Sequence, residues 1–458
     1  MKVFLRNKLS VMTVFMMSSL ALVGCNDDND STSSQTNPEK PVEVVDPTQP
    51  NQNTVYGKLL SYDGQTPIAN ALVYAVASAE GASVSNRIAA STYSPSSIQT
   101  ATVKSADSAA NTDCGIAPAN SLASTCTGTD GSYRLDLGTS TNELQIQFKK
   151  GAFSAEQELT LSGTGSSTTE ITQLEDTILT EVPKMLVIEG AYDSIELILA
   201  KLGLADVDAA DGDIIDSKFD IWESTDNLFV DSNNDGQANI FDYEVVFFNC
   251  GLDDESWLMD DDKKQMLKEY VDGGGRIYVS DLAYDVVEQT FPEYINYYGS
   301  DETPINQPEE VDSATTGEDS ITIRSNIEPT LKSWLEEVTC TQGDCLNTDG
   351  TVTIDGFASG WARMNGVNSS ENVDVYVSGQ DSDGTMRPLT VGFDYGSGRV
   401  TYTSYHNEEG SDSYCYSLLL DGTLNPEDYT ACLEDPTEVT SIQISAQQRI
   451  LQYLVFEL

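Results

Sequence analysis

The stretch YEVVFFNCG, residues 243–251, holds an unbroken apolar run in a chain of 458 residues that is otherwise strongly acidic. The stretches KMLVIEG, residues 184–190, and RIYV, residues 276–279, have the same form. Short apolar runs of this kind are typical of strands that are buried on both faces, as in a parallel sheet. Apolar residues at helical spacing lie between them, over 194–204 and 257–271. The alternation predicts an α/β domain with a parallel sheet covered on both faces.

Further along the chain, strands are expected at 388–393 and 399–404, and a closing helix at 446–456. The stretches LKEYVDGGG, residues 267–275, and YGSGRVTYTSYH, residues 395–406, complete a set of motifs around the apolar runs. With them, residues 184–458 resemble the class I glutamine-amidotransferase-like fold, in particular its trehalose-utilisation-like branch. The resemblance implies an α/β doubly wound (flavodoxin-like) domain.

Amidotransferases of that class place a cysteine nucleophile on a sharp turn after a strand and a His-x-Glu pair at a later strand end. His406 and Glu408 match the second part of this pattern, and His406 is the only histidine of the chain. The turn after residue 279 holds Ser280 and no cysteine, whereas Cys250 lies one strand too early. The candidates for catalysis are therefore His406, Glu408, Ser280 and Cys250, against the alternative that His406 only bonds locally at a strand end. We expect a domain without catalytic activity.

Upstream, residues 54–165 read as short strands separated by turns. The pattern is Gly57, then GQTPIANALV at 64–73, then TDGSYRL at 129–135. It resembles the carboxypeptidase regulatory-like domain, a transthyretin-like β-sandwich that serves as a scaffold and carries no catalytic residues of its own. An insertion rich in Ser and Ala, about 78–126, departs from that pattern. A linker is expected at 166–183, so that the chain is multidomain, with an N-terminal β-sandwich before the α/β domain.

The chain begins with three basic residues and an apolar run, which predicts a secretory signal peptide over 1–24. It closes with LVGC at 22–25, which resembles the lipobox of bacterial lipoproteins. That resemblance implies a lipid on Cys25, which would hold the protein to a membrane. Asn26, and not Asp, follows the cysteine, so we expect the outer membrane before the inner one. Residues 25–53 are polar and predict a disordered tether.

Eight cysteines are present, and apart from Cys25 and Cys250 they form close pairs in the sequence. Thiols oxidise outside the cytoplasm, so local disulfides are expected. Cys250 is expected to be a buried, small apolar residue. The expected disulfide pairs are Cys114 with Cys126, Cys340 with Cys345, and Cys415 with Cys432.

The stretch DSNNDGQANIFD, residues 231–242, places oxygen-bearing side chains at loop positions typical of calcium sites, with Gly236 where the chain must turn sharply. It resembles the EF-hand-type loop of dockerins, although it is single and a strand is expected after it. The alternative is an acidic surface turn. The resemblance implies Ca²⁺ bound by Asp231, Asn233, Asp235, Gln237, Asn239 and Asp242.

The formal net charge is −51 at pH 7. Such a surface repels nucleic acid, which we exclude as a partner. The sequence therefore predicts an envelope lipoprotein that is acidic and disulfide-bonded, with a binding or scaffolding role towards a glycan or protein ligand. The alternative is a hydrolase or amidotransferase-like enzyme that uses His406 and Glu408.

Overall fold

The computed structural model describes residues 53–78, 114–138, 143–161, 171–207, 214–252, 255–297, 307–318, 321–340, 343–357, 360–407 and 444–458. All of them belong to one compact unit, Pro50–Leu458. Several predictions fall outside these residues: the expected signal peptide, Cys25, nearly all of the expected tether, most of the insertion, Glu408, Cys415 and Cys432. No helix within the described ranges is long and apolar enough to cross a membrane.

The first part of the chain forms two four-stranded sheets that share one core. Alternating burial along their strands turns one face of each sheet inwards. Tyr133 of one sheet packs edge-on against Phe148 of the other, with ring centroids 5.3 Å apart. The first sheet consists of β4 (Ser132–Gly138), β1 (Asn53–Leu60), β7 (Ile171–Gln173) and β8 (Thr177–Ile178). The second has the order β3 (Ala123–Cys126), β2 (Leu72–Ala77), β5 (Glu143–Lys150) and β6 (Phe153–Thr160).

The segment 166–183, expected to be a linker, supplies β7 and β8, which both pair with β1 in parallel. Unpaired backbone groups on the edge of β1 explain why these few residues are drawn into the sheet. The structure is thus rich in β-sheet and holds several separate sheets, as expected of a multidomain chain.

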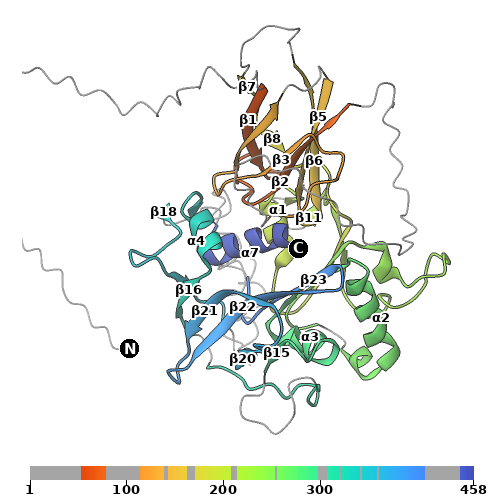
Figure 1. Cartoon of the computed structure of the whole chain (residues 1–458). Helices are drawn as coiled ribbons and strands as arrows, with labels where there is room; N and C mark the ends of the chain where they lie inside the picture. Colours follow the sequence, from red (N-terminus) through yellow and green to blue (C-terminus); the bar gives the residue numbers. More distant parts are fainter. Residues whose placement is uncertain are drawn as a thin grey trace, which may run out of the picture. The chain divides into compact units, whose positions relative to one another are not determined.

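A nine-stranded mixed sheet forms the second part of the chain. Its order is β12 (Phe219–Trp222), β9 (Met185–Ile188), β13 (Val245–Phe248), β14 (Arg276–Ser280), β23 (Gly398–Thr403), β22 (Met386–Tyr395), β21 (Val373–Gln380), β16 (Ile323–Ile327) and β19 (Val352–Ile354). Figure 1 shows β21, β22 and β23 as neighbouring strands.

The strands from β12 to β23 are parallel, whereas those from β22 to β19 join by antiparallel pairing. Numbered along the chain, the parallel strands have the order 2-1-3-4-5, which places a topological switch point between β9 and β13. The expectation of a parallel sheet was wrong for the second half. A two-residue turn joins β22 to β23, and strands connected so tightly must be antiparallel.

Two hydrophobic cores cover the two faces of this sheet. Met185 and Val187 of β9 belong to one core and Leu186 and Ile188 to the other, as the alternation of a strand requires. The first core also contains residues of α1 (Ile195–Lys201), α4 (Pro329–Leu335), α7 (Ala446–Glu457) and the two N-terminal sheets. The second contains residues of α2 (Asp261–Asp272) and α3 (Asp285–Thr290).

The N-terminal sheets are joined to α7 by specific contacts. Phe153 packs edge-on against Phe456, with ring centroids 5.0 Å apart. Lys150 and Glu457 form a largely buried ion pair of 2.6 Å, and the Ala152 amide donates to the Leu458 carbonyl. The two parts of the chain therefore share a continuous core in place of two separate ones.

The helix expected at 257–271 is divided. A 3₁₀ turn, η2 (Ser256–Met259), ends at Asp260, and α2 begins at Asp261. The side chain of Asp260 accepts a hydrogen bond from the Asp262 amide, so it caps the new helix. The remaining elements are short: β10 (Asp206–Val207), β11 (Ile214–Ile215), η1 (Asn239–Asp242), η3 (Asp281–Tyr284), β15 (Ile295–Asn296), β17 (Thr339–Cys340), β18 (Gly343–Asp344) and β20 (Gly366–Val367).

Two of the expected disulfides are present, Cys114–Cys126 and Cys340–Cys345. Each closes a local loop, the second beside the hairpin of β17 and β18. Cys250 is free and buried, as expected.

Candidate functional site

The carboxyl ends of β9, β13, β14 and β23 meet at one edge of the large sheet, beside the switch point. The loops after β9 and β13 are in backbone contact: the Ala191 amide donates to Gly251 and the Tyr192 amide to Cys250, at 3.0 and 3.1 Å. A Cβ atom at Gly190 would collide with the Cys250 carbonyl, so only glycine allows this approach. The crevice at the switch point is consequently closed by main chain.

Beneath these loops lies a cluster of three side chains from three strand ends, Cys250, Asp281 and His406. Nε2 of His406 is 2.8 Å from the Cys250 sulfur and 2.7 Å from Oδ2 of Asp281. The sulfur and Oδ2 are 3.9 Å apart. The exposed fractions are 0% for Cys250 and Asp281 and 1% for His406. The three groups are thus enclosed in the protein.

Main-chain groups hold each member of the cluster in place. Oδ1 of Asp281 accepts from the Ala362 amide at 2.6 Å, which leaves Oδ2 for His406. The Cys250 sulfur accepts from the Leu282 amide at 3.4 Å. The His406 amide donates to the Gly356 carbonyl at 2.7 Å. These contacts hold the Asp281 and Cys250 side chains and the main chain of His406 in place.

Asp281 follows β14 in a strained turn. Its φ of 39° lies in the left-handed region that few residues other than glycine adopt, although Asp tolerates it. Ser280, directly before it, is fully buried and accepts from the Cys250 amide through Oγ at 2.9 Å. In the resemblance described above, the turn after this strand carries the nucleophile, and here it carries a carboxyl group.

The cluster differs from a nucleophile relay in one respect. In a relay, the imidazole contacts the nucleophile through one nitrogen and the carboxylate through the other. Here Nε2 faces both partners. Burial, and then the Asp281 charge, raise the pKa of the Cys250 thiol well above its ordinary value. The thiol is therefore neither ionised at neutral pH nor reachable from solvent.

Further carboxyl groups surround the cluster. Oδ1 of the buried Asp193 accepts from the amides of Asn407 and Ser194, both at 3.0 Å, and burial raises the pKa of Asp193. Glu196 accepts from the Asn249 amide group at 3.2 Å. Burial raises the pKa of Glu196 to about 7. Some of these acids are accordingly protonated near neutral pH.

The structure brings together three of the four catalytic candidates, Cys250, Ser280 and His406. Glu408, the fourth, lies outside the described residues. Sequence reasoning missed Asp281 and Asp193. Asp281 directly follows a predicted buried strand, and groups at that place meet at the carboxyl edge of a parallel sheet. That position was the available signal.

Among the described residues, two groups of three His, Cys, Asp or Glu side chains lie close enough together to hold a metal ion. One is Cys250, Asp281 and His406, and the other is Glu255, Asp285 and Asp312. In the second group, Oδ2 of Asp285 accepts from the Asp312 amide at 2.9 Å. Burial raises the pKa of Asp285 to about 6.

The loop at 231–242 is held together by hydrogen bonds among its own residues. The Asp231 carboxylate accepts from the amides of Asp235 and Gly236, at 3.2 and 3.0 Å. Nδ2 of Asn233 donates to the carboxylates of Asp235 and Asp242, at 3.0 and 3.2 Å. Gly236 has a φ of 95°, as the sharp turn requires. These hydrogen bonds link four of the six expected positions, Asp231, Asn233, Asp235 and Asp242, within one loop.

The other two expected calcium ligands, Gln237 and Asn239, make hydrogen bonds of a different kind. The Gln237 amide donates to Oδ1 of Asp235 at 2.9 Å. The Asn239 side chain accepts from the Ser232 amide and donates to the Asn227 carbonyl and to the Ser232 hydroxyl. Asn239 is buried and closes the base of the loop. A single 3₁₀ turn, η1, precedes β13 here, where an EF-hand would have a helix.

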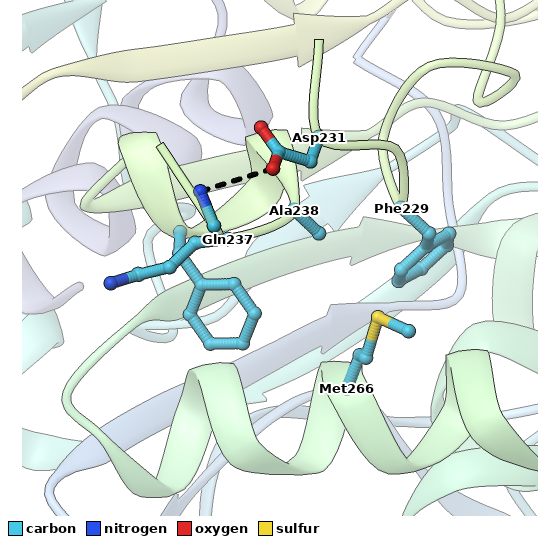
Figure 2. A pocket seen from close by; sticks show the side chains of 7 residues that line it. Phe229, Asp231, Gln237, Ala238 and Met266 are labelled. Carbon is cyan, nitrogen blue, oxygen red and sulfur yellow. Dashed lines mark hydrogen bonds between the residues drawn. The ribbon is translucent and has the colours of Figure 1, made fainter. Parts of the chain in front are cut away.

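A mostly apolar hollow lies beside the same loop (Figure 2). Phe229 and Met266 line it, and Asp231 stands at its rim with a hydrogen bond back to the loop. Its other lining residues are Gly236, Gln237, Ala238 and Phe241.

No protein-family model and no curated protein matches the chain. Among solved structures, the chain is similar to the cytoplasmic protein STM3548 from Salmonella typhimurium, at 14% identity and a TM-score of 0.23, over 48% of this chain and 87% of that one. It is similar to the cytoplasmic protein STM1381 from Salmonella typhimurium LT2, at 13% identity and a TM-score of 0.25, over 55% and 96%. A β-galactosidase from Rahnella sp. R3 has 11% identity and a TM-score of 0.24, over 50% of this chain and 29% of its own length.

Proposed function

We propose that the protein is a membrane-anchored envelope lipoprotein with a non-catalytic binding or scaffolding role. The segment before Cys25 and the lipobox-like LVGC support export and a lipid anchor. The disulfides Cys114–Cys126 and Cys340–Cys345 are what an oxidising compartment favours. The ligand proposed for it is a glycan or a protein of the cell surface.

One observation supports a non-catalytic role: the candidate reacting groups are buried. The Cys250 sulfur and the Ser280 hydroxyl belong to side chains with no exposed surface. His406 is held by two buried partners, and the sharp turn after β14 carries Asp281. A cysteine nucleophile must be a thiolate and must be accessible, and the buried Cys250 thiol meets neither condition in this state.

For the domains, we propose a carboxypeptidase regulatory-like β-sandwich over 54–165 and an amidotransferase-like, flavodoxin-like domain over 184–458. The paired four-stranded sheets support the first proposal. The parallel order 2-1-3-4-5 supports the second. In this proposal the first domain is a scaffold, and the shared core with α7 holds the second domain rigidly against it.

Labelling cells with radioactive palmitate tests the anchor. The wild-type protein should incorporate label and sediment with the outer membrane. Cys25→Ala should lose both properties, with Cys250→Ala as the matched cysteine control that keeps the label. An unlabelled wild-type protein, or label that survives Cys25→Ala, would contradict the anchor.

The second candidate is an enzyme, and the 2.8 Å contact between Cys250 and His406 favours it. A screen of amide, ester and glycoside substrates decides between the two. The binding role predicts no turnover. A turnover that His406→Gln and Glu408→Gln abolish, in variants with wild-type circular dichroism, would replace that role by a hydrolase or amidotransferase-like activity.

We further propose that the loop at 231–242 binds Ca²⁺. The hydrogen bonds that link Asp231, Asn233, Asp235 and Asp242 support it, since these side chains carry oxygen atoms and calcium prefers six to eight oxygen ligands. Titration calorimetry should show one calcium site, lost in Asp231→Ala and kept in Asp226→Ala, a neighbouring exposed acid outside the loop. Absence of heat at millimolar calcium would end the proposal.

A further inference from the structure

Three electron-rich atoms point at one another in the buried cluster: the Cys250 sulfur, Oδ2 of Asp281 and Nε2 of His406. Their separations are 2.8, 2.7 and 3.9 Å. They come from the ends of β13, β14 and β23, which neighbour one another in the sheet. A thiol, a carboxyl and an imidazole are three of the protein groups that bind first-row transition metals.

Nε2 of His406 has two close partners, the Cys250 sulfur and Oδ2 of Asp281. Nε2 carries at most one hydrogen, and it can direct that hydrogen at the sulfur or at Oδ2 but not at both. If the hydrogen is on Nδ1, the Nε2 lone pair can accept from the Cys250 thiol or from a protonated Asp281 carboxyl, at 2.8 and 2.7 Å, and one contact stays without a hydrogen unless both groups are protonated. A cation among the three atoms would satisfy all of them at once.

The ligand atoms are also oriented as those of metal sites are. The Leu282 amide points at the sulfur and the Ala362 amide at the other oxygen of Asp281. Such outer contacts fix the direction of metal ligands and tune their donor strength. Two buried amide oxygens next to the ligands in the chain, Oδ1 of Asn249 and Oδ1 of Asn407, have no hydrogen-bond partner among the residues that the structure describes.

We infer that Cys250, Asp281 and His406 form a binding site for a divalent transition metal, with Zn²⁺ the best match to a sulfur, nitrogen and oxygen set. In a tetrahedral zinc site the ligand atoms are roughly 3.3–3.6 Å apart. The contacts of Nε2 must therefore open by about 0.6 Å from their 2.7–2.8 Å, which small side-chain rotations provide. On binding, the thiol releases its proton to solvent and the sulfur forms the metal bond.

This site is separate from the proposed calcium loop and does not depend on the proposed role. Calcium prefers oxygen ligands, and a thiolate selects a softer ion. A metal here would join the ends of β13, β14 and β23 at the edge where the two loops close the switch point. It would therefore stabilise that edge of the sheet, and this structural role requires no catalytic activity.

Cobalt(II) tests the inference, because a cobalt–thiolate bond produces a charge-transfer absorption in the near ultraviolet. The mature protein in detergent is first freed of metal with a chelator and then titrated with Co²⁺. The band should appear and should stop growing at one Co²⁺ per chain. Zn²⁺ should displace the cobalt and remove the band. Asp231→Ala, in the calcium loop, and the double variant Cys415→Ser/Cys432→Ser should keep it.

Cys250→Ser should remove the band. His406→Gln and Asp281→Asn should weaken cobalt binding more than about 100-fold, since even the loss of an outer contact weakens metal binding about 10–100-fold. No band in the wild-type protein, or a band that survives Cys250→Ser, would overturn the inference. If Cys250→Ser fails to fold, the rate of alkylation of Cys250 is measured in partly unfolded wild-type protein instead. Zn²⁺ should lower this rate. An unchanged rate would overturn the inference.

Discussion

The loop at 231–242 and the cluster of Cys250, Asp281 and His406 are both groups of side chains that could hold an ion, but they are assembled in opposite ways. The acidic side chains of the loop are mostly exposed and bond within twelve sequence positions. Cys250 and His406 are separated by 156 positions, and their contact is completely buried. The loop is thus a local structure, whereas the cluster exists only because the sheet brings three strand ends together.

This difference has an energetic consequence. Exposed carboxylates keep most of their interaction with water, so their contacts contribute little to stability. A buried polar group that loses its partner costs far more, because water cannot replace it. Substitutions should therefore have large effects in the cluster and small effects in the loop.

The largest effect is expected for His406→Ala. It leaves the Asp281 carboxyl and the Cys250 thiol without their shared partner and opens a cavity in a buried region. We expect a loss of about 3–5 kcal/mol in the free energy of unfolding at pH 7. Urea denaturation measures it, with Asp226→Ala as a surface control that should stay within about 0.5 kcal/mol. A loss below about 1 kcal/mol would mean that the cluster is not a coupled network.

Asn239→Ala should have the next largest effect, although Asn239 belongs to the loop. Its side chain makes three hydrogen bonds at the loop base and is buried. We expect a loss of about 1–3 kcal/mol in calcium-free buffer. If Asn239 acted only as a calcium ligand, the substitution would change nothing until calcium is added.

Glu196→Gln should stabilise the protein at alkaline pH. Burial raises the pKa of Glu196 from 4.5 to about 7, so between these values the folded state keeps a proton that the unfolded state has released. The free energy of unfolding then falls as pH rises through this window. The Gln variant avoids the loss and should be about 1–2 kcal/mol more stable at pH 8, with no difference at pH 4.

Urea denaturation at several pH values checks this, and Asp226→Asn reports the effect of losing a surface charge alone. Equal stability of wild type and Glu196→Gln at pH 8 would contradict the expected change.

The smallest effect is expected for Asp231→Ala without calcium, below about 1 kcal/mol, since this exposed carboxylate accepts only from the Asp235 and Gly236 amides. With calcium, the wild-type melting temperature should rise and that of the variant should not. Thermal denaturation with and without calcium measures the difference. A large loss in the free energy of unfolding without calcium would mean that Asp231, like Asn239, stabilises the folded loop itself.

The sequence predicted the central strands well because their signal is local. Apolar runs at 184–190, 243–249 and 276–279 became β9, β13 and β14 within two residues at each end. The helix at 446–456 is α7, shifted by one residue at its end. A strand that is buried on both faces needs a continuous apolar run. Such a run can be recognised from the residues of the strand alone.

The two edge strands of the large sheet were harder to predict. β12 and β19 are only four and three residues long, and their apolar signal is weak. The hairpin of β22 and β23 was legible, because a tight turn at Gly396, with a φ of 59°, joins two expected strands. Short turns impose antiparallel pairing, and this signal should have outweighed the expectation of a parallel sheet.

By itself, the sequence determined the local features: the apolar strands, the two disulfides confirmed at Cys114–Cys126 and Cys340–Cys345, and the turn geometry of the loop at 231–242. Tertiary structure alone decided that His406 contacts Cys250 and Asp281, and that the N-terminal sheets share a core with α7. Local features depend on neighbours in the chain, whereas these contacts depend on strand order. Strand order is set by packing over the whole unit, and no short stretch of residues encodes it.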